Sequence, residues 1–363
     1  MPASQRCSRP LVSDCLPFRA TASPMILTRA IIAGCMALSL SACSLLLDDP
    51  VDKARAAFEA QDYIAARADV QVILSADPTN AEALELLARI QLAMGEGGDV
   101  AATLDRLEQA GGDPQDAALL AAEGLLQSGK SDAALALIGD DASAQGWRLR
   151  ALAAAAKGND ALARDAFRQG RRAKGDRGKL FAAEASYHLA RGDLTDAAQA
   201  VALATDVAPD RVETLFVSAR LAEMQADHVM ALSSYLRIIE IMPLDRPALI
   251  GAIYAAERAG KPDATRHLIA YGAQTRPLDR EFVYQQARML AWDGNWEQVR
   301  ANLQQHEAEL ADHDAARLLY AEALLQLGQV ETARAIAAPV IARSQGNADA
   351  TRIEAAIEAA SRG

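Results

Sequence analysis

The sequence predicts an all-α fold, a superhelical solenoid of repeated helix-turn-helix units. Three series of residues, in phase with one another, carry this prediction. Small or β-branched residues recur with a step of 34, glycine or alanine recurs with the same step between helices, and prolines mark the longer turns. The series are Ala163, Ala197, Ala231, Thr265, Val299 and Ala333; Gly158, Gly192, Ala226, Gly260, Gly294 and Gly328; and Pro209, Pro243 and Pro277. Such a chain buries its core between neighbouring units and offers an extended surface.

The N-terminal segment has the pattern of an exported lipoprotein. Residues 1–24 precede a secretion signal and are interpreted as a misassigned extension. Residues 25–42 combine one positive charge, an apolar stretch and small residues, which indicates a lipoprotein signal peptide. The run Leu40-Ser41-Ala42-Cys43 resembles the bacterial lipobox, in which a peptidase cuts before a cysteine that is then acylated. Cys43 is therefore the predicted lipidation residue, and a plain signal peptide is the alternative.

The predicted anchor sets the expected location. Residues 43–50 would form the lipidated cysteine and a short tether, which holds the solenoid close to a membrane. Several acyl chains on one residue anchor a protein far more firmly than one chain does. Ser44, rather than an aspartate, follows the cysteine and favours the outer membrane by analogy with enteric sorting. We expect a cell-envelope protein that faces the periplasm.

Composition and motifs argue against nucleic-acid binding and catalysis. From Cys43 onward the chain holds 33 basic and 47 acidic residues, a net charge of −14, which does not suit nucleic acid. The five histidines show neither the HExxH spacing nor cysteine partners of a zinc site. Residues 95–98 are glycine-rich but lack the lysine of a phosphate loop. The sequence predicts no enzyme, no cofactor and no metal.

Each unit is predicted to hold a helix of about 13 residues, a tight turn and a second helix of similar length. Residues 51–343 are assigned to about nine units, and residues 212–225 and 229–241 give the clearest pair of helices. The spacing before Ala163 is irregular, with steps of 37, 31 and 29 from Ala66, so we expect the array to bend or loosen there. Residues 344–363 are predicted to form a capping helix. Small residues also recur in the first helices, at Ala88, Ala122, Ala151, Ala185, Ala219, Ala287 and Ala321, with Ile253 the exception.

This pattern resembles the tetratricopeptide repeat, with its bulky first-helix residue, small residues at the helix crossing and a proline near the end of the unit. Residues 182–209 match it best, and Trp147, Leu84 and Leu215 occupy the bulky position in their units. The resemblance implies a non-catalytic scaffold that binds protein partners in a concave groove. Lipoproteins of this kind take part in outer-membrane protein insertion, pilus assembly and exopolysaccharide secretion, so a role in such a system is expected.

Residues one unit apart are expected to form ladders on the concave face, which the first helices line. Aromatic rings and guanidinium groups together suit extended peptides, acidic segments or sugar rings. The alternative is that these side chains only close the inner wall, paired with neighbours such as Glu223 and Glu257. The ladder residues are Phe216, Arg220, Ile250, Tyr254, Arg258, Tyr284, Arg288, Trp292 and Glu322.

A second candidate is the densest basic run of an acidic chain. It would face anionic lipid headgroups or an acidic polymer; the alternative is a solvated loop with arginine in a last helical turn. The basic run is Arg164, Arg168, Arg171, Arg172, Lys174, Arg177 and Lys179. Partners other than proteins therefore stay open: an anionic polysaccharide or peptidoglycan bound directly, or a cell-wall enzyme regulated without catalysis.

Overall fold

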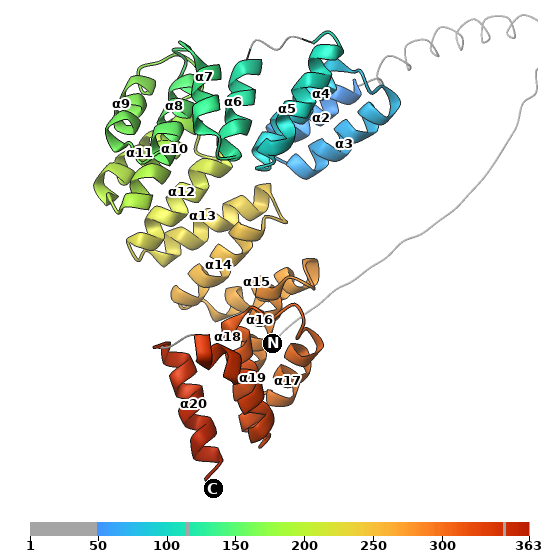
Figure 1. The fold of residues 1–363 in the computed structure, drawn as a ribbon, viewed down its shortest axis with the longest axis vertical. Helices are drawn as coiled ribbons and strands as arrows, with labels where there is room; N and C mark the ends of the chain where they lie inside the picture. Colours follow the sequence, from blue (N-terminus) through green and yellow to red (C-terminus); the bar gives the residue numbers. More distant parts are fainter. Residues whose placement is uncertain (1–48, 113–115, 344–345, 363) are drawn as a thin grey trace, which may run out of the picture.

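The structure is a computed structural model that describes residues 49–112, 116–343 and 346–362. The predicted extension, signal peptide and Cys43 lie outside these residues. Nineteen helices and no strand occupy the described part, following one another along a curved path (Figure 1). The helices are α2 (Pro50–Glu59), α3 (Tyr63–Ala76), α4 (Ala81–Ala93), α5 (Gly97–Gln109), α6 (Ala117–Gln127), α7 (Ser131–Ile138), α8 (Ala144–Ala156), α9 (Asp160–Gly170), α10 (Gly178–Arg191), α11 (Leu194–Val207), α12 (Val212–Met224), α13 (His228–Ile241), α14 (Arg246–Arg258), α15 (Pro262–Thr275), α16 (Arg280–Trp292), α17 (Trp296–Gln305), α18 (Asp314–Gln326), α19 (Val330–Arg343) and α20 (Ala348–Ala360).

The predicted solenoid is confirmed. Each helix packs on the next, and the even-numbered first helices of the units also contact one another directly from α2 to α12 and from α16 to α20. They therefore form an inner layer, with the second helices outside. The best-defined helices, α12 and α13, match the predicted ranges to within one residue at each end. None of the described helices is long and apolar enough to cross a membrane.

In the irregular region before Ala163, the helices pack on one another as they do in the rest of the array. There α7 is only 8 residues long, yet it contacts α6 and α8, and α5 contacts α6. The shorter helix accounts for the shorter step in the sequence. A small cluster of Ala122, Ala134, Ile138 and Leu149 fills the core here. The helix packing is therefore continuous through this region.

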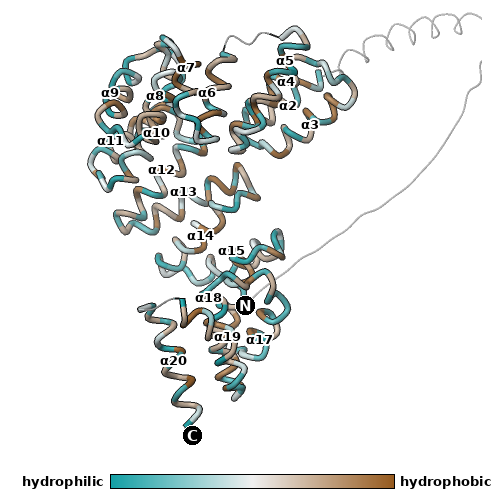
Figure 2. The backbone as a smooth tube through the Cα atoms, viewed as in Figure 1, coloured by the Kyte–Doolittle hydropathy of each residue, from teal (hydrophilic) through white to brown (hydrophobic). Residues whose placement is uncertain are grey.

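Small side chains at the helix crossings hold each unit together. Every member of the 34-residue series from Ala163 to Ala333 is 0 or 1% exposed, as is the first-helix series from Ala88 to Ala321. A methyl group at the crossing lets two helices approach closely. Apolar and polar residues are interspersed along the helices (Figure 2), and each described helix buries some of its apolar residues.

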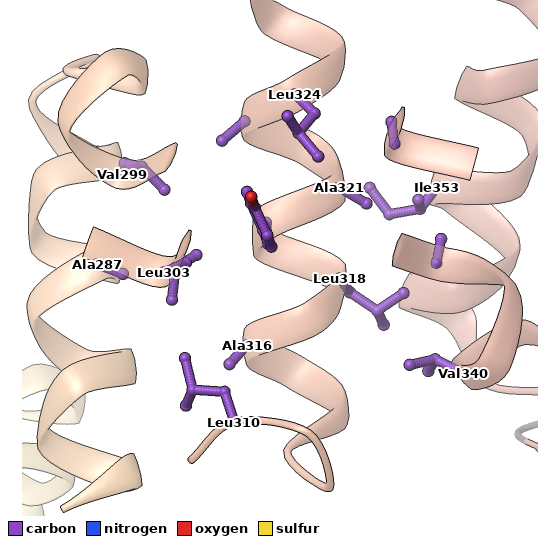
Figure 3. Packing of buried hydrophobic residues seen from close by; sticks show 14 of the residues in the cluster. Ala287, Val299, Leu303, Leu310, Ala316, Leu318, Ala321, Leu324, Val340 and Ile353 are labelled. Carbon is purple, nitrogen blue, oxygen red and sulfur yellow. The ribbon is translucent and has the colours of Figure 1, made fainter. Parts of the chain in front are cut away.

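Larger side chains pack between units, where glycine leaves room for rings. The Tyr235 ring of α13 lies over Gly251 of α14, and the Phe282 ring of α16 lies over Gly272 of α15; a Cβ at either glycine would be within 2.4 Å of the ring. At the C-terminal end, Val299 and Leu303 pack on one side of α18 and Val340 and Ile353 on the other (Figure 3). Ile353 and Ile357 of α20 are both buried in this cluster.

The tight turns use left-handed backbone geometry at the predicted positions. Gly158, Gly192, Gly260, Gly294 and Gly328 have φ between 64° and 75°. Ala226 occupies the same place with φ 59°. Only glycine adopts this conformation without a steric cost.

We expect Ala226→Gly to stabilise the protein by about 1 kcal/mol, because glycine relieves the steric cost of the left-handed turn. Urea unfolding followed by circular dichroism measures the change. Ala259→Gly is the matched control, because Ala259 has φ −76° in the turn one unit later, and there glycine should not stabilise. Equal effects of the two substitutions would contradict the explanation.

The superhelix brings the first hairpin against a unit far along the chain. The Gln61 side chain, in the α2–α3 turn, donates to the Asp210 carbonyl (3.1 Å) and accepts from the Val212 amide (2.9 Å). An apolar cavity of about 630 Å³ adjoins this contact and is lined by Tyr63, Met94, Met242 and others. This closure depends on the superhelical pitch and has no counterpart in the sequence pattern.

Candidate binding grooves

The first candidate site is a hollow of about 440 Å³, here called the inner groove, which the first helices α4, α6, α8, α10 and α12 line together. Two of the ladder residues, Phe216 and Arg220, lie in it. All the predicted ladder residues, from Phe216 to Glu322, belong to the regular half of the array. The inner groove also draws on the irregular half, because α4, α6 and α8 contribute to its wall beside α10 and α12.

Ion pairs fix most charges of the inner groove. Arg148 pairs with Glu123 at 2.6 Å, and both side chains are largely buried. Burial opposes ionisation of Glu123, but the Arg148 charge outweighs it and lowers the pKa of that carboxyl. Lys179 of the basic run lies 4.0 Å from Glu213. Arg220 is exposed and has no ion pair or hydrogen bond among the described residues, so it is the available cation of this groove.

The second candidate site is a hollow of about 320 Å³ at the other end, here called the C-terminal groove. It gathers four ladder residues, Tyr284, Arg288, Trp292 and Glu322, from α16 and α18. Trp296 of α17 and Arg352 of α20 complete it, and neither was among the sequence candidates. Trp296 lies on the other side of the tight turn from Trp292, in a second helix, so the 34-residue spacing of first-helix residues does not predict it. Arg352 belongs to the capping helix, outside the repeat phase.

Arg288 organises the aromatic side of the C-terminal groove. Its guanidinium donates to Glu257 at 2.7 Å and lies 5.7 Å from the centre of the Tyr284 ring and 5.4 Å from that of Trp292. These distances suit cation–π attraction. Arg352 donates to both carboxylate oxygens of Glu322, at 3.0 and 3.1 Å. The alternative interpretation, in which ladder residues pair with neighbours such as Glu257, thus describes Arg288, while Trp292 stays 45% exposed and accessible.

A half-buried carboxylate, Glu281, holds the ladder residue Tyr254 in place. Glu281 accepts hydrogen bonds from the Tyr254 hydroxyl and the Gln285 amide, both at 2.8 Å, and contacts His313 at 3.3 Å. These hydrogen bonds, led by that to His313, outweigh burial and lower the Glu281 pKa to about 2. Burial and the bond to Glu281 raise the pKa of Tyr254 to about 12. The His313 ring also lies 4.8 Å from that of Tyr284.

The remaining ladder residues lie between the two grooves. Ile250, Tyr254 and Arg258 are on α14 and line neither groove. Ile250 packs in the core cluster of the central units, and Tyr254 is held by Glu281. Arg258 is exposed. The structure therefore divides the predicted continuous ladder into two grooves separated by α14.

Comparison with known proteins identifies the fold. No family model matches the chain, and no curated protein matches it in sequence. It is similar to a chain in the crystal structure of the APC/C hetero-tetramer Cut9-Hcn1, with a TM-score of 0.52 and 16% identity over 75% of this chain and 54% of that chain. The repeats are tetratricopeptide-like. This tetratricopeptide-like chain spans about half the length of the solved chain, and at this identity the likeness shows the fold alone.

The basic run of the tetratricopeptide-like array is mostly paired within the protein. Arg164 contacts Asp193 at 2.9 Å, Arg168 contacts Asp165, and Arg171 contacts the buried Glu184 at 3.0 Å. Arg168 is in the last turn of α9, as expected if the basic run is a solvated loop with arginine in a last helical turn. Three members, Arg172, Lys174 and Arg177, are exposed in the loop between α9 and α10. The seven charges therefore do not form one free cationic patch.

Proposed function

We propose that this protein is a lipid-anchored scaffold that faces the periplasm and binds a protein partner of an envelope assembly or export system. A tetratricopeptide-like fold is typically a non-catalytic scaffold for protein–protein interaction. The observation that carries the proposal is the wall of five first helices around the inner groove, together with the accessible aromatic side chains of the C-terminal groove. Side chains from five helices line the first groove and side chains from four helices line the second, so an extended chain bound in either would contact several units at once.

The anchor is proposed from the lipobox-like sequence before Cys43. Metabolic labelling with a fatty-acid analogue should mark the wild-type protein, and Cys43→Ser should abolish both the label and membrane retention. Continued labelling of the variant would overturn the assignment. Fractionation of inner and outer membranes then tests the proposed outer-membrane location.

Crosslinking in intact cells followed by pull-down tests the partner class. A stoichiometric protein partner supports the scaffold. Direct binding to polysaccharide or peptidoglycan is the second candidate, since Tyr284, Trp292 and Trp296 meet at one groove and flat aromatic faces stack on sugar rings. Retention on purified glycan without a protein partner would favour that candidate. Recovery of a cell-wall enzyme, with altered activity of that enzyme, would identify the regulator alternative.

We expect Trp292→Ala to weaken binding of the recovered partner about tenfold or more, because exposed aromatic anchors carry a large share of interface energy. The loss should appear in surface plasmon resonance while circular dichroism stays unchanged, since the side chain is 45% exposed. Val229→Ala, at a 61% exposed apolar residue on the second helix α13, is the matched control. Unchanged affinity of the Trp292 variant would remove the C-terminal groove from the proposal.

A further inference from the structure

The tight turn between α10 and α11 brings three metal-ligating side chains together. Gly192 closes the turn with φ 75°, and the Asp193 amide donates to the His188 carbonyl at 3.0 Å. His188 Nδ1 is then 3.5 Å from Asp193 Oδ2 and 3.8 Å from Asp196 Oδ2. One ligand atom from each of the three residues lies within 4.8 Å of the other two. One imidazole nitrogen and two carboxylate oxygens therefore converge on one point.

His188 is buried with an unsatisfied nitrogen. The residue is 5% exposed, and its Nδ1 has no hydrogen-bond partner among the described residues. Such a buried polar atom is costly unless something binds it. The separations of 3.5 and 3.8 Å are at or beyond the outer limit of a hydrogen bond. They are close to the spacing of about 3.3 Å expected between two ligands of one tetrahedral ion with bonds of about 2.0 Å.

The repeat itself shows that packing does not require a histidine here. One or more units away, the equivalent positions hold the buried residues Ala154, Ala222, Ala256 and Leu324. Asp196 likewise corresponds to Leu162 and Met230, both exposed. The combination of the three side chains is thus confined to one unit, and His188 stands there in place of an apolar residue that is buried in the other units.

Asp193 also departs from its usual role. It occupies the N-cap position of α11, but its side chain caps no backbone amide. One unit later, Asp227 at the same position accepts a hydrogen bond from the Met230 amide at 3.0 Å. The Asp193 carboxylate is instead turned toward His188 and toward Arg164, which donates to it at 2.9 Å.

We propose that His188, Asp193 and Asp196 bind a divalent first-row cation, with Zn²⁺ as the preferred ion. Imidazole and carboxylate together suit such ions, whereas Mg²⁺ and Ca²⁺ prefer oxygen ligands alone. Three protein ligands leave a fourth position for water. The Arg164 guanidinium competes for Asp193, so metal binding would weaken the link between α9 and the α10–α11 turn.

Calorimetric titration of the full chain in detergent with ZnCl₂ tests the proposal. We expect one saturable site that Mg²⁺ does not fill. His188→Ala and Asp196→Asn should each weaken Zn²⁺ binding by at least about tenfold. Arg164→Ala should strengthen it about fivefold, because a competing positive charge near the ion is removed. Absence of a saturable site in the wild type would overturn the proposal. Unchanged Zn²⁺ affinity in either ligand variant would overturn it as well.

The variants are chosen so that loss of folding does not imitate loss of binding. His188→Ala introduces the residue that Ala222 supplies in the next unit, and Asp196 has a side chain that is 53% exposed. Circular dichroism should therefore match the wild type for both. His267→Ala, which removes an exposed histidine outside the cluster, should leave Zn²⁺ affinity unchanged. Equal or weaker affinity after Arg164→Ala would overturn the assignment of Asp193 as a ligand.

Discussion

Phe282→Ala should destabilise the solenoid by about 3–5 kcal/mol, the usual cost of deleting a fully buried aromatic side chain. The Phe282 ring is 0% exposed and lies between α15 and α16, against Gly272. In a repeat array each unit is stabilised mainly by its neighbours, so a weakened interface also separates the units on either side. In urea unfolding followed by circular dichroism, we expect the midpoint to fall to a lower urea concentration. The transition should also broaden or split into two. Leu278→Ala, at a 67% exposed residue nearby, should change stability by less than about 0.5 kcal/mol.

A double-mutant cycle separates ring packing from general core loss. Gly272→Ala alone would place a methyl group 2.3 Å from the Phe282 ring and should cost about 1–3 kcal/mol. In a Phe282→Leu background the shorter side chain leaves room for this methyl group. The cost of Gly272→Ala should then fall. Additive effects of the two substitutions would show that ring and glycine do not act together.

The fold could be predicted from the sequence because it depends on local spacing. A residue such as Ala197 or Ala231 must be small wherever two helices cross, and the crossing recurs with the unit. The turn at Gly192 or Ala226 likewise follows from helix length. Both properties are set within one unit, so a single sequence is enough to reveal them.

The candidate site could be predicted only in part, because it depends on how units are placed relative to one another. The phase of the repeat placed Tyr284, Arg288 and Trp292 on one face, as observed. It could not show that α14 divides the ladder, nor that Gln61 meets Val212, since small rotations between units add up along the array. Which acidic residue pairs with each member of the basic run, as Glu184 does with Arg171, also depends on tertiary distances.

Glu281→Gln should remove a pH-dependent part of the protein's stability. Glu281 contributes this part where it contacts the ladder residue Tyr254. The Glu281 pKa is about 2 in the folded protein and 4.5 in its unperturbed state. The unfolded chain therefore binds more protons between these values. The stabilisation is complete above pH 4.5 and is lost as the pH falls toward 2. Because the carboxylate is partly screened by solvent, we expect about 1–3 kcal/mol at neutral pH.

Urea unfolding of Glu281→Gln at pH 7 and at pH 3 measures this contribution. The amide keeps the shape of the carboxylate and can still accept from Tyr254 and Gln285, which share Oε1. It places an N–H donor where Oε2 faces His313 Nε2, so the variant should be less stable at pH 7. At pH 3 the difference from wild type should shrink, because the unfolded wild-type chain is already protonated there. Glu331→Gln, at an exposed carboxylate, should alter neither value. A loss of equal size at both pH values would mean that Glu281 supports the ladder by its shape and hydrogen bonds and not by its charge.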